Sequence, residues 1–316
     1  MSWCLISKNT ASCKRYDLSC FDSLNMKNIP ADAEYISLRD RFSFTITNVS
    51  SFEGAENLPK ELKYLDITGT RISSFKGTEK LPRSLKKLIM DYMPEFTSFE
   101  GVENLPQGLE VLVISSKRKI CVKGIENLPQ GLKELTIEAG YRVNHINSFH
   151  MIKNLPPNLK HLNLYNNIIT SFDGAEFLPK SLEILDLRIN EITSFKGCEK
   201  LPRGLKNLKL ENNFLTSFEY VENLPQNLKE LDLACNFKFT SYEKAINLPR
   251  SLICLYPPYF SDFCLDYIKE LQFKSDFQNC LDEIYYNPRL ERMKSKLVEE
   301  QKIYNENPEK LLELIQ

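Results

Sequence analysis

Residues 178–200 read LPKSLEILDLRINEITSFKGCEK, and residues 201–223 read LPRGLKNLKLENNFLTSFEYVEN. Both stretches begin with Leu-Pro, a pair that occurs nine times in the 316-residue chain. The intervals between successive pairs are 23, 24, 23, 27, 23, 23, 23 and 24 residues. A fixed period in this range is typical of a solenoid, in which each repeat buries its apolar face against its neighbours. The leucines of the nine pairs are Leu58, Leu81, Leu105, Leu128, Leu155, Leu178, Leu201, Leu224 and Leu248.

A short alternating pattern in each repeat predicts a β-strand. In the first quoted repeat, Leu185 and Leu187 are separated by one polar residue, so both side chains fall on one face of an extended segment. Leu182 and Ile192 complete the apolar core of the repeat. Repetition of this strand about every 23 residues predicts a parallel sheet, with each return segment crossing on the opposite side.

The return segments carry a glycine column and an aromatic column. The glycines indicate a bend with little room for a side chain. The aromatic residues are expected to form a stacked spine inside the convex layer. This spine includes Phe172, Phe195 and Phe218.

The frame L-x-x-L-x-L-x-x-N-x-I resembles the leucine-rich repeat, and the match covers about residues 29–256. The Leu-Pro variant also resembles repeats of secreted bacterial effectors and of amoebal and viral repeat proteins. The resemblance implies that the Asn lines the inside of the turn and binds backbone groups of adjacent turns. The matching residues are Asn167, Asn190, Asn213 and Asn236, whereas the first four full repeats carry Thr70, Met93, Lys117 and Gly140 instead.

We therefore predict an α/β solenoid, a leucine-rich repeat horseshoe with one parallel strand per repeat of 23–24 residues. Its expected parts are an N-terminal cap at residues 1–28, about ten repeats at 29–256, and a helical C-terminal cap or tail at 257–316. Asn-Pro pairs at 287–288 and 307–308 are typical helix starts. The tail either covers the last repeat or forms a separate partner-binding helix.

The composition gives no bulk signal for a polyanionic partner. The chain has 41 Lys and Arg against 42 Asp and Glu, a net charge of -1, so neither nucleic acid nor a membrane is predicted as a partner. No apolar run is long enough to span a bilayer, and no signal peptide is recognised. The nine cysteines form no CxxC pair, which favours free thiols and a cytoplasmic protein, the host cytosol for a secreted effector. Disulfides within the two caps are the alternative.

Motifs of catalysis and metal binding are missing from the sequence. The chain has three His, none in an HExxH motif or near Cys at zinc spacing, and it has no P-loop, GxGxxG or GxSxG. A column of glutamates recurs in the return segments, which is a structural pattern rather than a catalytic pair. We therefore predict no catalytic residue, no metal, no cofactor and no enzymatic activity.

The outward strand residues contain two groups that differ from a generic solvated face. Exposed apolar area with polar neighbours indicates a protein contact, and Tyr and Arg are favoured there. The alternative is that these are ordinary strand residues, present only because such side chains favour β-strands. The first group is Tyr64, Lys87, Ile89, Val111 and Val113, and the second is His161, Tyr165, Ile184 and Arg188.

By family analogy, the leading hypothesis is a non-enzymatic, monomeric module that holds one protein partner on the concave face of the sheet. A pathogen effector and an intracellular adaptor both fit it. The alternative is a ubiquitin-ligase component, either a substrate-recognition adaptor acting through the helical tail or, less favoured, the ligase itself.

Overall fold

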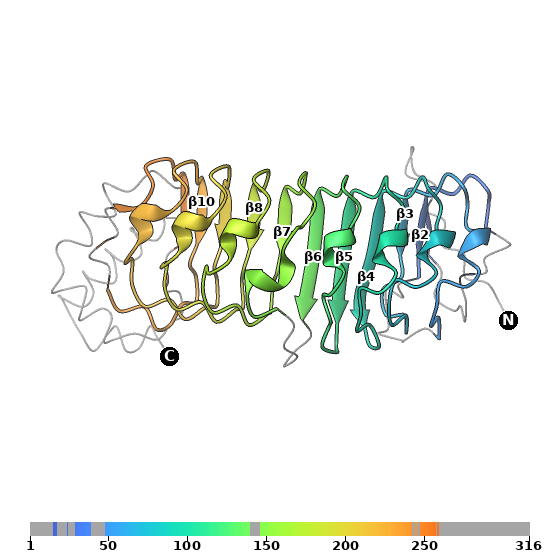
Figure 1. The fold of residues 1–316 in the computed structure, drawn as a ribbon, viewed down its shortest axis with the longest axis horizontal. Coiled ribbons are helices and arrows are strands. Elements are labelled where there is room, and N and C mark those ends of the chain that lie inside the picture. Colours follow the sequence, from blue (N-terminus) through green and yellow to red (C-terminus); the bar gives the residue numbers. More distant parts are fainter. Residues whose placement is uncertain are drawn as a thin grey trace, which may run out of the picture.

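In a computed structural model of the chain, the strands of successive repeats lie side by side in one long parallel sheet (Figure 1). The strands follow one another in chain order from β1 to β11, and within the described residues the sheet is open, with no pairing of β1 to β11. The residues that the structure describes are 15–17, 24, 29–38, 48–139, 146–241, 244, 247–256 and 258.

Each repeat consists of one strand and a return segment that usually contains a short 3-10 helix, and these helices lie over one face of the sheet (Figure 1). The strands are β1 (Arg15–Asp17), β2 (Tyr35–Ser37), β3 (Tyr64–Asp66), β4 (Lys87–Met93), β5 (Val111–Ser116), β6 (Glu134–Ala139), β7 (His161–Asn163), β8 (Ile184–Asp186), β9 (Asn207–Lys209), β10 (Glu230–Asp232) and β11 (Cys254–Tyr256). The 3-10 helices are η1 (Ala55–Asn57), η2 (Thr78–Lys80), η3 (Val102–Asn104), η4 (Ile125–Asn127), η5 (Phe149–Ile152), η6 (Ala175–Phe177), η7 (Cys198–Lys200) and η8 (Val221–Asn223).

The core lies between the sheet and the return segments. Leu185 pairs in register with Leu162 and Leu208, and all three side chains are almost fully buried. The solenoid with one parallel strand per repeat is therefore confirmed for the described residues. Burial of one leucine side chain contributes about 1.5–3 kcal/mol to the free energy of folding. Because the leucine column recurs in every turn, it supplies most of the hydrophobic stabilisation of the array.

The phenylalanine column lies inside this core, with Phe172 and Phe195 fully buried and Phe218 2% exposed. In the amino-terminal half, the ring of Phe75 contacts the ring of Phe99 edge to face, with 5.5 Å between centroids. This geometry is favourable for aromatic pairs. The column therefore packs successive return segments against one another.

Seven of the eight 3-10 helices in the described residues begin directly after a residue with a positive φ angle, whereas η5 begins after Ser148, whose backbone is extended. Gly101 has a φ of 88°, and a Cβ atom there would lie 2.7 Å from the backbone carbon of Phe75 in the preceding turn. Only glycine fits that close approach. The eighth helix begins instead after Tyr220, whose φ of 72° is an unfavourable left-handed conformation for a residue with a side chain.

The three-residue strands β3, β7, β8 and β10 carry Asp or Asn at the third strand position, whereas β9 is equally short with Lys209 there. Asp186 ends a three-residue strand because its carboxylate accepts a hydrogen bond from the backbone N–H of Arg188, at 3.1 Å. Asn163 forms the same turn with Tyr165, at 2.8 Å. Such side-chain bonds compete with the sheet ladder. β4, β5 and β6 carry Ile89, Val113 and Thr136 at this position and extend to seven, six and six residues.

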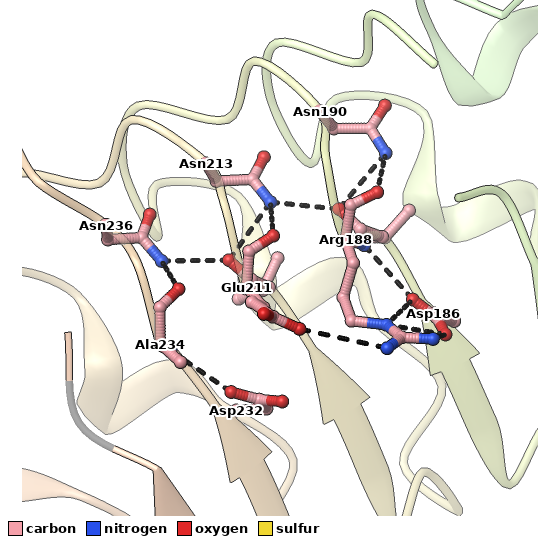
Figure 2. Close-up of polar contacts among 10 residues, drawn as sticks. Asp186, Arg188, Asn190, Glu211, Asn213, Asp232, Ala234 and Asn236 are labelled. Atoms are coloured by element: carbon pink, nitrogen blue, oxygen red, sulfur yellow. Dashed lines mark hydrogen bonds and ion pairs between the residues drawn. The ribbon is translucent and has the colours of Figure 1, made fainter. Parts of the chain in front are cut away.

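The asparagine column joins adjacent turns through its side-chain amides (Figure 2). Nδ2 of Asn190 donates to the backbone oxygens of Leu164 and Leu187, and Oδ1 accepts from the N–H of Ile169 at 2.9 Å. The same set of bonds recurs at Asn167, Asn213 and Asn236.

In the amino-terminal half, the turn that carries Lys117 uses a hydroxyl group in place of this amide. The buried hydroxyl of Ser116 bonds the backbone oxygens of Met93 and Phe96, at 3.1 and 2.6 Å. Ser116 directly precedes Lys117, the residue that departs from the asparagine frame. A hydroxyl one position earlier thus links the turns in place of the amide.

The caps proposed from the sequence fall mostly outside the described residues. All of 1–28 except 15–17 and 24, and all of 257–316 except 258, lie outside them. The described part of the chain contains only 3-10 helices and no long α-helix. The helical C-terminal cap therefore stays a prediction.

Candidate functional site

The face of the sheet that points away from the core, hereafter the strand face, is built from matching positions of successive strands. Its first column is aligned by the ladder register, in which Tyr64 pairs with Lys87, Lys87 with Val111, and His161 with Ile184. The side chains of this column are half-buried, since each packs between the same residues of the turns on either side. The strand face is therefore a continuous surface rather than separate loops.

The first group from the sequence forms one patch on β3, β4 and β5, hereafter the apolar patch: Tyr64, Lys87, Ile89, Val111 and Val113. Val111 lies beside Lys87, and Val113 lies beside Ile89. Nζ of Lys87 is 5.6 Å from the ring centroid of Tyr64, a cation–π contact. All five side chains are half-buried, so the patch presents apolar area without being fully exposed.

Tyr35 extends the apolar patch and was not singled out from the sequence. Its ring stacks on that of Tyr64 with 3.9 Å between centroids and 13° between planes. The first repeat matches the frame poorly, since it begins with Ile29-Pro30 in place of Leu-Pro, so Tyr35 was not recognised. Ile36 and Leu38 nevertheless fit the strand frame and place Tyr35 in the outward column. The stacked pair fixes the ring of Tyr64 on the strand face.

The second group also comes together, hereafter the Arg188 cluster: His161, Tyr165, Ile184 and Arg188. The guanidinium carbon of Arg188 is 5.3 Å from the ring centroid of Tyr165. His161 lies beside Ile184 in the ladder, and its Nδ1 is 3.4 Å from a carboxylate oxygen of Glu134. The cluster therefore lies on the turns of β7 and β8 and contacts Glu134 of β6.

Two carboxylates hold Arg188 in one orientation (Figure 2). Its Nε donates to both oxygens of Asp186, at 2.9 and 3.0 Å, and Nη2 donates to one of them at 2.7 Å. Nη1 lies 3.8 Å from a carboxylate oxygen of Glu211 on the next turn. The hydrogen bonds to Asp186 raise the pKa of Arg188 above its usual range, so it stays charged.

Asp186, at the third position of β8, is itself buried. It is 6% exposed, and Asp66, at the same position of β3, is 5% exposed. Both carboxylates accept the N–H two residues later, which draws them toward the backbone. They orient neighbouring groups rather than offering a free charge.

Glu138, on β6, is a strand-face residue that belongs to neither of the two groups predicted from the sequence. Partial burial, followed by the nearby negative charges of Asp91 and Asp186, raises the pKa of Glu138 to about 7. Burial and the charge of Glu138 also raise the pKa of Tyr165 above its usual range. The space between the apolar patch and the Arg188 cluster is therefore acidic and titrates near neutral pH.

The described residues do not form a site for metal chemistry. Among them, no group of three or more His, Cys, Asp or Glu is placed to hold a metal ion. Nor does the described part of the chain contain a helix long and apolar enough to cross a bilayer. The thiols of Cys121, Cys198 and Cys235 are free, whereas Cys4, Cys13, Cys20, Cys264, Cys280 and His145 lie outside the described residues.

Comparison with known proteins supports the fold through structures rather than sequences. No family model and no curated relative matches this sequence. An internalin (inlF) from Listeria monocytogenes is similar over 74% of this chain and 69% of its own, with 17% identity and a TM-score of 0.51. The circular leucine-rich repeat protein CroV588 is similar over 74% of this chain, with 25% identity and a TM-score of 0.50. The leucine-rich repeat domain of APL1B has 14% identity and a TM-score of 0.47, over 78% of this chain and 67% of its own.

The fold is that of leucine-rich repeat proteins, and the resemblance recognised in the sequence is confirmed. This chain covers only 35% of the solved chain of CroV588, the circular protein. Within the described residues its own sheet is open, because strand order runs from β1 to β11 without closure.

Proposed function

We propose that this protein is a non-enzymatic interaction module that binds one protein partner on its strand face. The observation that carries the proposal is the coincidence, on consecutive turns of one sheet, of the apolar patch with the Arg188 cluster. Aromatic and arginine side chains on a partly apolar surface are the residues that dominate binding energy at protein interfaces.

Both groups are held in place before a partner arrives. Tyr64 is stacked on Tyr35, and Arg188 is fixed by Asp186 and by the ring of Tyr165. A side chain that is already ordered loses little conformational entropy on binding, which favours affinity. The strand face therefore suits a partner with a complementary, ordered surface.

The charges of the strand face define the partner further. Asp91, Glu138 and Glu211 each stand four residues after the first strand residue of their turn, on the strand face. The partner is therefore expected to place a lysine or arginine opposite Glu138. Such a cation favours the ionised carboxylate and lowers the pKa of Glu138 in the complex. Binding should therefore release a proton and become tighter as pH rises from about 6 to about 8.

We place the protein in the cytoplasm as a monomeric adaptor, or in the host cytosol if it is a secreted effector. The free thiols of Cys121, Cys198 and Cys235 support this placement. The ubiquitin-ligase alternative depends mainly on the tail at 257–316, and incubation with ubiquitin, E1 and E2 tests it through autoubiquitination.

Affinity capture from a eukaryotic lysate tests the proposed function directly. Three forms of the full chain serve as bait: wild type, the double variant Val113→Asp with Arg188→Glu, and Glu103→Lys on the return side as a control. Proteins retained by wild type and the control but lost by the double variant support a strand-face partner. Equal recovery with all three baits contradicts it.

A further inference from the structure

The turns that precede the strands form a continuous edge of the solenoid, hereafter the basic edge. In each turn the backbone N–H of the residue before the strand bonds the equivalent oxygen one turn earlier. Lys86 bonds Lys63 and Lys206 bonds Glu183, both at 2.8 Å. Because β4, β5 and β6 all point away from it, this edge is the upper one in Figure 1.

Positive charge is concentrated on this edge, although the whole chain has a net charge of -1. From 59 to 253, the nine turns read PKELK, PRSLK, PQGLE, PQGLK, PPNLK, PKSLE, PRGLK, PQNLK and PRSLI. Their carboxylates are Glu61, Glu110 and Glu183. Their cations, all exposed, are Lys60, Lys63, Arg83, Lys86, Lys133, Lys160, Lys180, Arg203, Lys206, Lys229 and Arg250.

Two of the carboxylates neutralise only part of this charge. Glu110 lies between Lys86 and Lys133, with ion pairs of 3.2 and 2.6 Å. Glu183 lies between Lys160 and Lys206 at the same two distances. Among the described residues, no carboxylate is within ion-pair distance of six edge cations: Lys60, Arg83, Lys180, Arg203, Lys229 and Arg250.

We infer that the basic edge binds the surface of an anionic lipid bilayer by charge alone, without insertion. Neighbouring strands lie about 4.8 Å apart, so the cations from Lys60 to Arg250 extend over roughly 40 Å. The turns of the basic edge lie at about one level along the array (Figure 1), so the row can meet a flat surface at every turn, and mobile anionic headgroups can gather under each cation. Each lysine or arginine near such a surface strengthens binding about fivefold.

The composition and shape of the edge favour a bilayer over nucleic acid. The nine turns contain no aromatic residue, whereas single-stranded nucleic acid is held largely by stacking on aromatic rings. The phosphates of a duplex wind around its axis, so a straight row of cations meets them at only a few points. A planar surface uses the whole row.

Sedimentation with vesicles tests this inference on the full-length protein. Vesicles of phosphatidylcholine with about one-third phosphatidylserine should bind it at about 0.05 M salt and release it at about 0.5 M, because salt screens exposed charges. Vesicles of phosphatidylcholine alone should not bind it. The triple variant Lys180→Ala, Arg203→Ala and Lys229→Ala should lower the partition coefficient about 100-fold.

The matched control is Lys119→Ala, Lys123→Ala and Lys196→Ala, which removes three exposed lysines away from the basic edge. It should bind vesicles within about threefold of wild type, since its charges lie far from the lipid surface. Absence of binding at low salt, or equal losses in both variants, overturns the inference. So does tighter, edge-dependent binding to a labelled DNA duplex than to vesicles, since the edge would then serve nucleic acid.

Discussion

The side-chain amide nitrogen of Asn190 lies 3.0 Å from the backbone oxygen of Leu164, one turn earlier in the array. One turn later, Asn213 repeats the contact with Leu187, at 2.9 Å. A buried amide that bonds two turns fixes their spacing, since a shift of either turn leaves polar groups without partners. This ladder keeps the strands in register and so keeps the strand face continuous.

Asn190→Ala should lower the free energy of unfolding by about 2–4 kcal/mol. It leaves the buried N–H of Ile169 without its acceptor and removes one of the two amide donors from the oxygens of Leu164 and Leu187, which keep those of Asn167 and Asn213. Urea denaturation followed by circular dichroism measures the change. The neighbouring exposed residue provides the control, since Glu191→Ala should change stability by less than about 0.5 kcal/mol. Equal effects of the two substitutions would show that the amide contributes nothing.

Tyr220→Gly should stabilise the protein by about 0.5–1 kcal/mol. It relieves a left-handed conformation that is unfavourable for tyrosine, and this gain exceeds the extra entropy that glycine loses on folding. The reciprocal change, Gly197→Ala, places a side chain at a φ of 89° and should destabilise. Urea unfolding measures both changes. A loss of stability in Tyr220→Gly would contradict the claim that the left-handed conformation of Tyr220 is strained.

Glu138 should make stability fall as pH rises. Its pKa is raised from 4.5 to about 7 in the folded state, so between these values the unfolded chain releases a proton that the folded protein keeps. Below pH 4.5 the shift does not affect the free energy of unfolding, and above about pH 7 its destabilising effect is complete. Glu138→Gln should therefore stabilise at pH 8 by about 1–2 kcal/mol, after allowance for solvent screening, and change little at pH 4.

Thermal melts of Glu138→Gln across this pH range measure the effect. Glu110→Gln is the control of opposite sign, because hydrogen bonds from Lys133 and Lys86 lower the pKa of Glu110. It should give no stabilisation at pH 8. Identical pH profiles of wild type and Glu138→Gln would contradict the raised pKa of Glu138.

The described thiols should differ widely in reactivity. Cys121 is exposed, whereas burial raises the pKa of Cys198 to about 12 and keeps it protonated. At pH 8 a thiol reagent should label Cys121 quickly and Cys198 only after unfolding, as peptide mapping would show. Titration of the unfolded, non-reduced chain should find all nine cysteines free. Protected pairs would contradict the cytoplasmic placement.

The sequence predicted the fold well because each periodic residue type occupies the same structural position in every repeat. Leu185, Phe195 and Asn190 are buried as their columns indicate, since a repeat of fixed length brings identical side chains into identical surroundings. The extended strands β4 to β6 were not predicted. These strands lack the Asp or Asn that forms a turn at the third strand position, but that lack is not sufficient, since β9 carries Lys209 there and has only three residues.

The candidate site was predicted in part. The outward column placed Tyr64 beside Lys87 and His161 beside Ile184, because strand register follows from the repeat length. The pairing of Arg188 with Asp186 and the titration of Glu138 depend on side-chain packing between turns, which the repeat frame does not specify. Tyr35 was overlooked because its repeat is degenerate.

Isothermal titration of the captured partner tests the central claim, that the strand face is the binding surface. Val113→Asp and Arg188→Glu should each weaken binding by more than about 2 kcal/mol, roughly thirtyfold. Val113→Asp should leave thermal stability nearly unchanged, whereas Arg188→Glu should lower it, because the buried carboxylate of Asp186 loses its partner. Glu103→Lys, exposed on the return side, should bind like wild type. Wild-type affinity in both strand-face variants, together with loss of binding on deletion of 257–316, would contradict the claim and assign binding to the tail.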